Sequence, residues 1–539
     1  MEKTGSLALA CFILLAVTLG PAIGQDWPTY RHDGARSGVT SEEVKVPLYT
    51  QWVFKPIHAP KPAWPPPAEE LPRMHSDNAY HVAVSGGMVL FGSSVEDSLY
   101  ALDARTGEIR WTFPAEGPIR FAPTIWKDRV YFGSDDGYVY CLGMKDGKLI
   151  WKYRAGPSDE RVIGNGRMIS RWPVRTSVLV EEGVVYFGAG LFPYEGIYIC
   201  ALKADDGSVL WKNDTIGDHP YELSFGGISP QSYLVASKDI LYVPSGRAMP
   251  AAFDKKSGRF LFYCPPGGKE GGTWARVENG QLIAGVEKSG TPVKVAYDGR
   301  TGKRKGDVYA WFPGLDMVVT PDVAYTVTDE GIHAVARAAY PHISQKLNDI
   351  RAERKKLAGM ISDLRRKALE VDDIFGREIE DQIDALMRRI NELADEEERN
   401  LKSIACKWQY RRGGLYTLIL VGNTIFAGGD GIVVAVDAKT GKEIWNGEVK
   451  GRAYGLAASD GRLFVSTDKG YIYCFGGEKV SRSKVIVPKV VQLPSGEVDE
   501  IAVEVPRTNE IMPDLVPSPY PDDDLTSLYE AAAEGIVKE

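Results

Sequence analysis

Arginine stands beside or near an aromatic residue in several short segments of this 539-residue chain. A guanidinium group fits a carboxylate or a phosphate, and an aromatic ring can stack on the same ligand. The combination predicts a site for a carboxylate, a phosphate or an acidic sugar. The alternative is that these arginines pair with acidic residues or backbone carbonyls of the protein itself. The candidate binding residues are Arg120, Arg171, Trp172, Arg175, Trp274, Arg276, Arg452 and Tyr454.

Other catalytic and metal-binding patterns are weak. No histidine pair has zinc-ligand spacing, and the closest cluster is His75-Ser76-Asp77 with His81. Asp135-Asp136-Gly137 has only part of a calcium loop and is explained as a hairpin turn. No Gly-x-Ser-x-Gly nucleophile motif occurs. We therefore predict no catalytic residue and no metal ligand.

The elements that must position the arginines are marked by a repeated phrase. It consists of a small apolar pair, a turn with Thr-Gly or Asp-Gly, and a tryptophan. The clear copies end at Trp111, Trp151, Trp211 and Trp445. Glycine accepts the positive φ of a tight turn without steric cost, so each turn joins two strands. A recurrence at roughly 40 residues is typical of a repeat architecture.

Each unit contains four predicted strands, which is the composition of a β-propeller blade. Less clear copies end at Phe262 and Trp408, and a weak copy without tryptophan lies at 296–302. The last unit, 462–475, stops before its tryptophan strand. The segment around Trp52 matches that missing strand, so we predict that it completes the last blade and closes a ring of eight.

The propeller interpretation predicts where the candidate arginines lie in the fold. They lie in segments that lead into the innermost strand of a blade, and these segments converge on the axis of a propeller. The long segment 156–175 is expected to lie over one mouth of this funnel. The repeated tryptophans are explained by packing between adjacent blades.

The phrase from Leu99 to Trp111 resembles the pyrroloquinoline-quinone (PQQ)-type propeller repeat. That repeat occurs in quinoprotein dehydrogenases and in the propeller subunit of the bacterial outer-membrane protein assembly machinery. Residues 26–38 resemble the segment before such propellers in many exported bacterial proteins. The resemblance covers roughly residues 26–476 and implies an all-β, eight-bladed propeller. Enzymes and non-enzymes share the repeat, so it does not decide the activity.

A quinoprotein dehydrogenase of this family would carry adjacent cysteines near the cofactor, calcium ligands and a catalytic aspartate. The sequence has no Cys-Cys pair, and the calcium ligands and the base match no motif in it. We therefore expect no cofactor. The alternative is a PQQ-dependent oxidoreductase that uses PQQ with calcium.

The N-terminus predicts export. Lys3, an apolar run over 7–19 and small residues before Gln25 are typical of a signal peptide. No later segment approaches ~18 apolar residues, so we expect no transmembrane segment after cleavage, and a location in the periplasm or cell envelope of a bacterium. The net charge of −8 argues against a nucleic-acid partner. Cys141 and Cys474 occupy equivalent repeat positions and are expected to be buried free thiols.

Helical sequence replaces the usual turn between Val335 and Trp408. Its apolar residues follow a heptad pattern with a break near 371–376, which predicts an antiparallel helical hairpin. The hairpin is either a self-contained decoration with a buried seam or a docking arm for a partner.

The sequence thus predicts an exported, non-catalytic propeller that binds or scaffolds another envelope protein, an anionic small molecule or a glycan. The predicted parts are a signal peptide (1–24), a lead-in (25–48), a propeller (49–477) closed by the strand 49–55, a helical hairpin within the sixth blade (340–405), and a Pro-rich acidic tail (478–539).

Overall fold

A computed structural model describes most of the chain between residues 26 and 488. The described residues are 26–64, 76–164, 166–216, 228–245, 248–263, 274–286, 293–303, 312–337, 340–368, 373–403 and 406–488. The chain divides into two compact units, Met1–Pro488 and Lys489–Glu539. The predicted signal peptide, and the predicted tail after residue 488, lie outside the described residues.

Within the described residues, six four-stranded antiparallel sheets follow one another along the chain. The first three are β3 (Ala83–Ser85) to β6 (Ile109–Pro114) through β4 (Met88–Gly92) and β5 (Ser98–Asp103); β7 (Thr124–Trp126), β8 (Arg129–Gly133), β9 (Tyr138–Gly143) and β10 (Leu149–Arg154); and β13 (Leu179–Glu181), β14 (Val184–Ala189), β15 (Tyr198–Lys203) and β16 (Val209–Asn213). The next three are β17 (Val235–Ala236), β18 (Ile240–Ser245), β19 (Ala248–Asp254) and β20 (Phe260–Phe262); β21 (Trp274–Glu278), β22 (Gln281–Val286), β23 (Val293–Asp298) and β24 (Phe312–Pro313); and β25 (Asp316–Val319), β26 (Val323–Thr328), β27 (Gly331–Ala336) and β28 (Cys406–Arg411).

An eight-stranded sheet joins the N-terminal part of the chain to its last strands, in the order β1-β29-β30-β31-β32-β33-β2-β34. Its strands are β1 (Val39–Thr40), β2 (Tyr49–Phe54), β29 (Leu415–Val421), β30 (Thr424–Asp437), β31 (Glu443–Ser459), β32 (Arg462–Thr467), β33 (Ile472–Gly476) and β34 (Lys484–Ile486). A separate hairpin consists of β11 (Arg161–Gly164) and β12 (Arg167–Ser170), and a short 3-10 helix, η1, spans Pro193–Glu195.

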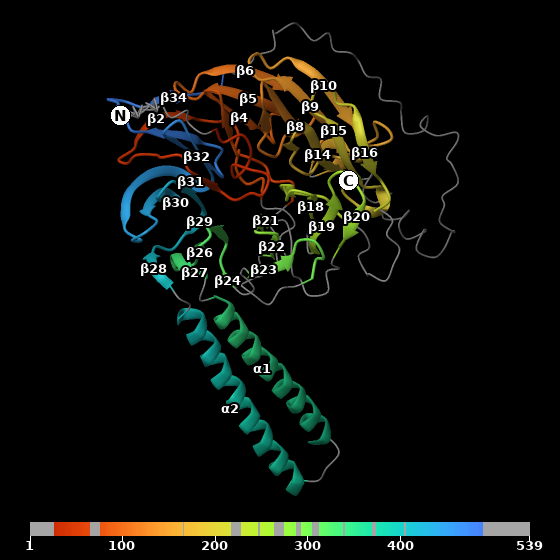
Figure 1. The fold of residues 1–539 in the computed structure, drawn as a ribbon, viewed down its shortest axis with the longest axis vertical. Coiled ribbons are helices and arrows are strands. Elements are labelled where there is room, and N and C mark those ends of the chain that lie inside the picture. The colour runs from red at the N-terminus through yellow and green to blue at the C-terminus, as the bar shows by residue number, and fades with distance from the viewer. Residues whose placement is uncertain are drawn as a thin grey trace, which may run out of the picture. The chain divides into compact units, whose positions relative to one another are not determined.

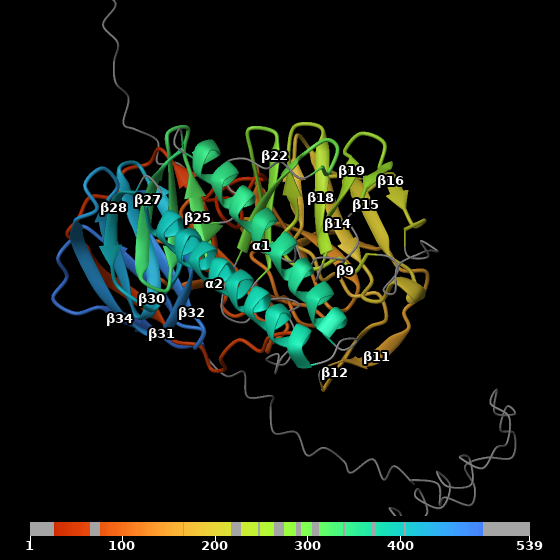
Figure 2. The same cartoon turned by 90° about the horizontal axis from the view of Figure 1, so that it is seen from below.

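The sheets lie around a common centre, as Figures 1 and 2 show. The first strands of neighbouring sheets contact one another, for example β3 with β7, β7 with β13, and β25 with β29. We call these first strands, together with residues 453–459 of β31, the inner strands. The fold is therefore mostly β and propeller-like, as the repeat predicts.

The repeated phrase is a single contact between adjacent sheets. Gly147 has a φ of +67°, and a Cβ added there would lie 2.6 Å from Cε3 of Trp111. Glycine is therefore required both for the turn and for the tryptophan that packs on it. The indole nitrogen also donates to a backbone carbonyl of the next sheet: Trp111 to Met144 (2.9 Å), Trp151 to Ala204 (3.0 Å), Trp211 to Lys255 (2.9 Å) and Trp408 to Ala438 (3.0 Å).

The strand around Trp52 pairs with the last unit of the repeat. β2 runs antiparallel to β33, with Trp52 opposite Cys474. This is the pairing that the missing tryptophan strand predicts. Trp445 in the preceding part of the same sheet donates its indole N–H to the carbonyl oxygen of Leu48 at 2.9 Å.

Two long helices, α1 (Tyr340–Ala368) and α2 (Asp373–Ser403), separate β27 from β28. They lie side by side in both views (Figures 1 and 2). Glu397 of α2 accepts hydrogen bonds from Arg351 (2.5 Å) and Arg354 (2.6 Å) of α1. The apolar residues Leu347, Ile350, Ile361 and Leu393 are buried along the helices.

The cysteines agree with the sequence prediction where the structure describes them. Cys141 and Cys474 are buried and free, as is Cys200, and Cys406 is free and exposed. Among the described residues, no helix has the length and apolar character needed to cross a membrane.

Candidate functional site

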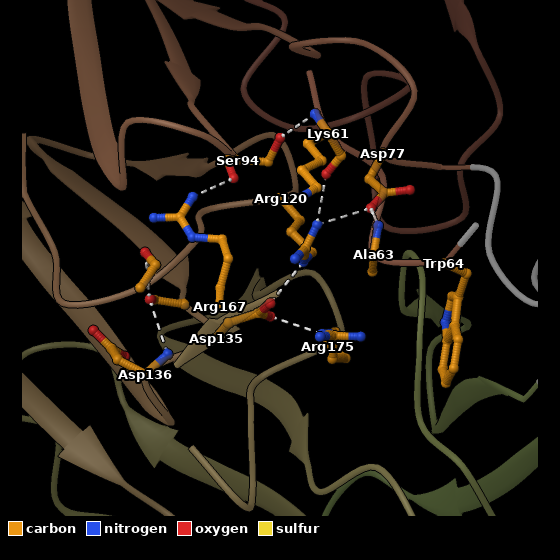
Figure 3. Close-up of polar contacts among 12 residues, drawn as sticks. Lys61, Ala63, Trp64, Asp77, Ser94, Arg120, Asp135, Asp136, Arg167 and Arg175 are labelled. Carbon is orange, nitrogen blue, oxygen red and sulfur yellow. Dashed lines mark hydrogen bonds and ion pairs between the residues drawn. The ribbon is translucent and has the colours of Figure 1, made fainter. Parts of the chain in front are cut away.

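Two of the predicted arginines meet at one buried carboxylate. Arg120 Nε donates to Asp135 Oδ2 at 2.7 Å, and Arg175 Nε donates to Asp135 Oδ1 at 2.8 Å (Figure 3). All three side chains are almost completely buried. A carboxylate held between two guanidinium groups fixes both of them, and these bonds are of the strong charge-assisted kind.

The geometry follows from the hairpin turn between β8 and β9. Asp135 lies in this turn, whereas Arg120 precedes β7 and Arg175 precedes β13. Asp136, the next residue, accepts hydrogen bonds from the backbone N–H of Tyr138 (2.9 Å) and the hydroxyl of Tyr140 (2.6 Å). The Asp-Asp-Gly run is thus a hairpin turn, as predicted. Its first aspartate, Asp135, also binds the two arginines that precede β7 and β13.

A segment from the N-terminal side covers this cluster. Arg120 Nη1 donates to the carbonyl oxygen of Lys61 (3.0 Å) and to Asp77 Oδ2 (3.2 Å). The backbone N–H of Ala63 donates to the same Asp77 oxygen at 2.7 Å (Figure 3). Trp64 Nε1 donates to Gln231 at 3.2 Å. The second oxygen of Asp77, Oδ1, is buried without a hydrogen-bond partner among the described residues.

Burial and charge act in opposite directions on these carboxyl groups. Burial alone would raise the pKa of Asp135, but the charges of Arg120 and Arg175 outweigh it and hold the pKa below its ordinary value. Burial dominates at Asp77, and its pKa is raised despite the nearby Arg120. Asp135 is therefore ionised at neutral pH and forms the negative centre of the cluster.

A second buried cluster surrounds Asp316 on β25. Arg31 Nη1 donates to Asp316 Oδ2 at 2.7 Å, and Arg276 donates to Oδ1. Thr417 Oγ1 donates to Oδ2 at 3.0 Å, and Trp274 Nε1 donates to Oδ1 at 3.2 Å. Burial opposes ionisation of Asp316, yet the charges of Arg276 and Arg31 lower its pKa to about 2. Burial and the charge of Arg31 lower the pKa of Arg276 to about 9.

The other predicted residues lie apart from these two clusters. Trp172 is buried and donates Nε1–H to the carbonyl oxygen of Glu195 at 2.6 Å, while Arg171 pairs with Glu160 at 2.8 Å. The Arg452 guanidinium lies 5.9 Å from the ring centre of Tyr416, and that ring lies 5.1 Å from the ring of Tyr454. The eight candidates therefore occupy several places and do not line one surface.

The ion pairs limit what the site can do. Arg120, Arg175 and Arg276 each bind a carboxylate of the chain itself, which is the alternative that the sequence left open. Arg175 is bound through Nε to Asp135, and its side chain is only 3% exposed. No three His, Cys, Asp or Glu side chains of the described part are placed to hold a metal ion.

Sequence reasoning missed the acidic partners and one of the arginines. Asp77 was grouped only with the histidines, and Asp316 carried no motif. Arg31 lies in the lead-in, 285 residues from Asp316. The available signal was the presence of two arginines, Arg31 and Arg36, close together in the lead-in.

Comparisons with known proteins agree with the repeat. The family model of the outer membrane protein assembly factor BamB matches residues 66–219 and 407–485. BamB of Yersinia pestis is 30% identical over 161 residues, which cover 29% of this chain and 37% of that protein. The dehydrogenase subunit of the quinone alcohol dehydrogenase of Gluconobacter oxydans is 27% identical over 143 residues, covering 24% of this chain and 18% of the enzyme. This chain is therefore similar to the PQQ-like repeat proteins, as the phrase predicts.

A longer match involves the quinoprotein alcohol dehydrogenase PedH of Pseudomonas putida, 24% identical over 75% of this chain and 73% of that enzyme. The solved structure of a quinohemoprotein alcohol dehydrogenase from Pseudomonas putida is 13% identical with a TM-score of 0.50, and the match covers 86% of this chain and 82% of that chain. This structural likeness shows the fold alone. The relatives of this chain thus include both an outer-membrane assembly factor and quinone-dependent alcohol dehydrogenases.

Proposed function

We propose that this chain is an exported, non-catalytic, eight-bladed β-propeller that binds another protein of the bacterial cell envelope. The observation that carries the proposal is an exposed apolar surface on two neighbouring loops. The similarity to the outer membrane protein assembly factor BamB supports a protein partner and an envelope location. A PQQ-dependent oxidoreductase is the alternative.

The sheets support a count of eight blades. Six are the four-stranded sheets, and the eight-stranded sheet supplies two more when it is divided within β31. The seventh then contains β29, β30 and the first half of β31, and the eighth contains the second half of β31 with β32, β33 and β2. Trp52 would complete the eighth blade and close the ring against the first. The fold is then a rigid carrier for its loops.

The buried clusters support a non-catalytic function. PQQ carries carboxylates, and holding it with calcium requires uncommitted cationic and acidic side chains. In the part of the chain that the structure describes, Arg120 and Arg276 are committed to Asp135 and Asp316, and no group of metal ligands is assembled. This commitment of the buried charges supports a non-catalytic function.

The proposed binding surface consists of Ile163, Met168, Phe192 and Tyr194. Ile163 and Tyr194 are each 80% exposed, and Met168, opposite Ile163 in the β11–β12 hairpin, is 53% exposed. The rings of Phe192 and Tyr194 stack at 5.7 Å. The bond from Trp172 to the carbonyl oxygen of Glu195 ties the loop of η1 to the segment that follows β12. Exposed apolar groups gathered in this way are typical of a protein-binding surface.

The experiment is capture of envelope proteins by the tagged full-length protein and by an Ile163→Asp/Tyr194→Ser variant. We expect the variant to lose at least tenfold of the captured partner while its melting temperature stays within about 2 °C of the wild type. Leu149→Asp/Leu210→Ser is the matched control, because both leucines are exposed on the outer strands β10 and β16. Equal capture by the wild type and the Ile163→Asp/Tyr194→Ser variant would contradict the proposal.

The helical pair is the other candidate for docking. Its buried apolar residues and the ion pairs of Glu397 support the self-contained interpretation of α1 and α2. Deletion of 341–403 with a short Gly-Ser connection should then leave partner capture unchanged. Loss of capture in this variant would assign the docking function to the helices.

A further inference from the structure

The lead-in residues 26–42 lie along the inner strands of the propeller. The backbone of Trp27 exchanges two hydrogen bonds with Val84 of β3, at 2.7 and 2.8 Å. The carbonyl oxygen of Pro28 accepts from Ile125 of β7 at 2.7 Å. In Figure 1 this red N-terminal segment runs into the middle of the arrangement of sheets. The segment therefore begins against the first two sheets.

The contacts continue around the ring. The carbonyl oxygen of Gly34 accepts from Ala236 of β17 at 2.8 Å, and that of Ala35 accepts from Val277 of β21 at 3.1 Å. β1 then pairs in parallel with β29, and Glu42 accepts a bond from the backbone N–H of Gly461 at 2.7 Å. The two ends of the lead-in, at residues 27–28 and 39–40, use the free edge of an inner strand, as in strand addition by a bound peptide. The residues between them form turns that are closed by bonds of their own, such as that from the Gly38 N–H to the Arg31 carbonyl oxygen at 3.1 Å.

Side chains of the lead-in are buried like those of a bound ligand. Trp27 and Arg36 are 0% and 1% exposed. Arg36 donates to the carbonyl oxygen of Leu234 (2.8 Å) and to Ser177 Oγ (3.4 Å), which precede β17 and β13. Arg31 reaches Asp316 of β25 at 2.7 Å and the carbonyl oxygen of Leu418 of β29 at 3.1 Å. The ring of Tyr30 stacks on Tyr233 with centroids 3.6 Å apart.

We propose that the inner strands form a peptide-binding site and that residues 26–42 are its built-in ligand. The site recognises a peptide that is folded into turns over residues 29–35 and that carries a buried tryptophan, a stacking tyrosine and two arginines. Asp316 is the acceptor for the first arginine. The second, Arg36, donates to the Leu234 carbonyl oxygen and Ser177 of the site, and its Nη1 also holds the turn of the peptide by bonds to Thr29, Tyr30 and Asp33. The covalent link to β2 is not needed for recognition, because every contact above is non-covalent.

The connection between ligand and ring offers a place to cut. Glu43, Lys45 and Pro47 are exposed between the buried Glu42 and Leu48. A protease recognition sequence inserted after Lys45 allows the full chain to fold first and to be cleaved afterwards. Native mass spectrometry then measures how much of the N-terminal peptide stays with the ring. We expect one peptide per ring to be retained after cleavage and buffer exchange, and to be replaced only when an excess of competing peptide is added.

A synthetic peptide of residues 26–42 tests recognition without altering the ring. The unlabelled peptide should displace a fluorescent copy from the cleaved protein. A peptide with Arg31→Ala and Arg36→Ala should bind at least 100-fold more weakly, whereas Glu43→Ala, in a peptide extended to residue 43, should bind as well as its parent. Loss of the N-terminal peptide on cleavage would overturn the proposal. Equal displacement by the wild-type and double-alanine peptides would also overturn it.

Discussion

The indole Nε1–H of Trp52 donates a hydrogen bond to the carbonyl oxygen of Ala104 at 3.0 Å, and the two residues lie on the last and first sheets of the repeat. Trp111 makes the equivalent bond to Met144. A Cβ added to Gly107 would lie 2.7 Å from the ring of Trp52, as one added to Gly147 would from Trp111. The contact between the last and the first sheet therefore has the same chemistry as a contact between consecutive units.

Replacement of Trp52 by phenylalanine tests whether this contact is equivalent to the others. The change keeps much of the buried apolar area but leaves the Ala104 carbonyl without its donor, so we expect a loss of about 1–3 kcal/mol in the free energy of unfolding. Trp111→Phe, measured by the same urea titration, should cost a similar amount. If Trp52→Phe left the free energy of unfolding unchanged while Trp111→Phe lowered it, the contact between the last and first sheets would contribute little to stability.

Removal of the charge of Asp135 leaves two buried arginines without their shared carboxylate. Asp135→Asn should therefore cost about 3–5 kcal/mol of the free energy of unfolding. Asp363→Asn is the matched control, because Asp363 also pairs with an arginine, Arg366, but both side chains are exposed on α1. That pair should contribute about 1 kcal/mol or less. Equal, small losses in chemical denaturation would contradict the structural function of the Asp135 cluster.

Stability should decrease in acid through Asp316. Its pKa of about 2 in the folded protein lies below the ordinary value of 3.8, since the charges of Arg276 and Arg31 outweigh burial. The resulting stabilisation is fully present above pH 4 and is lost as the pH falls toward 2, a change on the order of 2 kcal/mol. Urea titrations between pH 2 and 6 should show a shallower acid decline for Asp316→Asn. The same slope in both proteins would contradict this assignment.

The architecture was readable from the sequence because its signal is local. Each Thr-Gly or Asp-Gly turn and the tryptophan that follows it lie within a few residues of one another in the sequence. That tryptophan then packs on the glycine of the next unit, as Trp111 does on Gly147, and the contact repeats from unit to unit. The absence of a tryptophan strand after Cys474 and the match at Trp52 then predicted a pairing between the two ends. The helices were similarly predicted from the spacing of residues such as Leu347 and Ile350.

The site was less predictable because its partners are distant along the chain. Arginine beside an aromatic residue has the same appearance whether it binds a ligand or an internal carboxylate. Asp316 has no distinguishing neighbours, and Arg31 and Arg276 approach it from different sheets or segments. The insertion of residues 26–42 along the inner strands also leaves no local pattern, because it depends on bonds to strands throughout the ring.

The helical pair should open independently of the sheets. Leu393 is 1% exposed and lies in the seam, so Leu393→Ala should cost about 2–4 kcal/mol locally. Hydrogen exchange should then become at least tenfold faster for amides of α1 and α2, while amides of β8 and β9 keep their rates. Met387→Ala, at an exposed position of α2, is the control. Equal acceleration in the helices and in β8 and β9 would contradict local opening.

The central claim is that this propeller binds rather than catalyses, and titration with PQQ tests it most directly. The purified full-length protein is mixed with PQQ and calcium, and its absorption spectrum is recorded before and after addition of an alcohol. We predict no stoichiometric complex and no change in the spectrum on addition of the alcohol. A tightly bound, one-to-one chromophore that the alcohol reduces would contradict the account and establish a quinoprotein oxidoreductase.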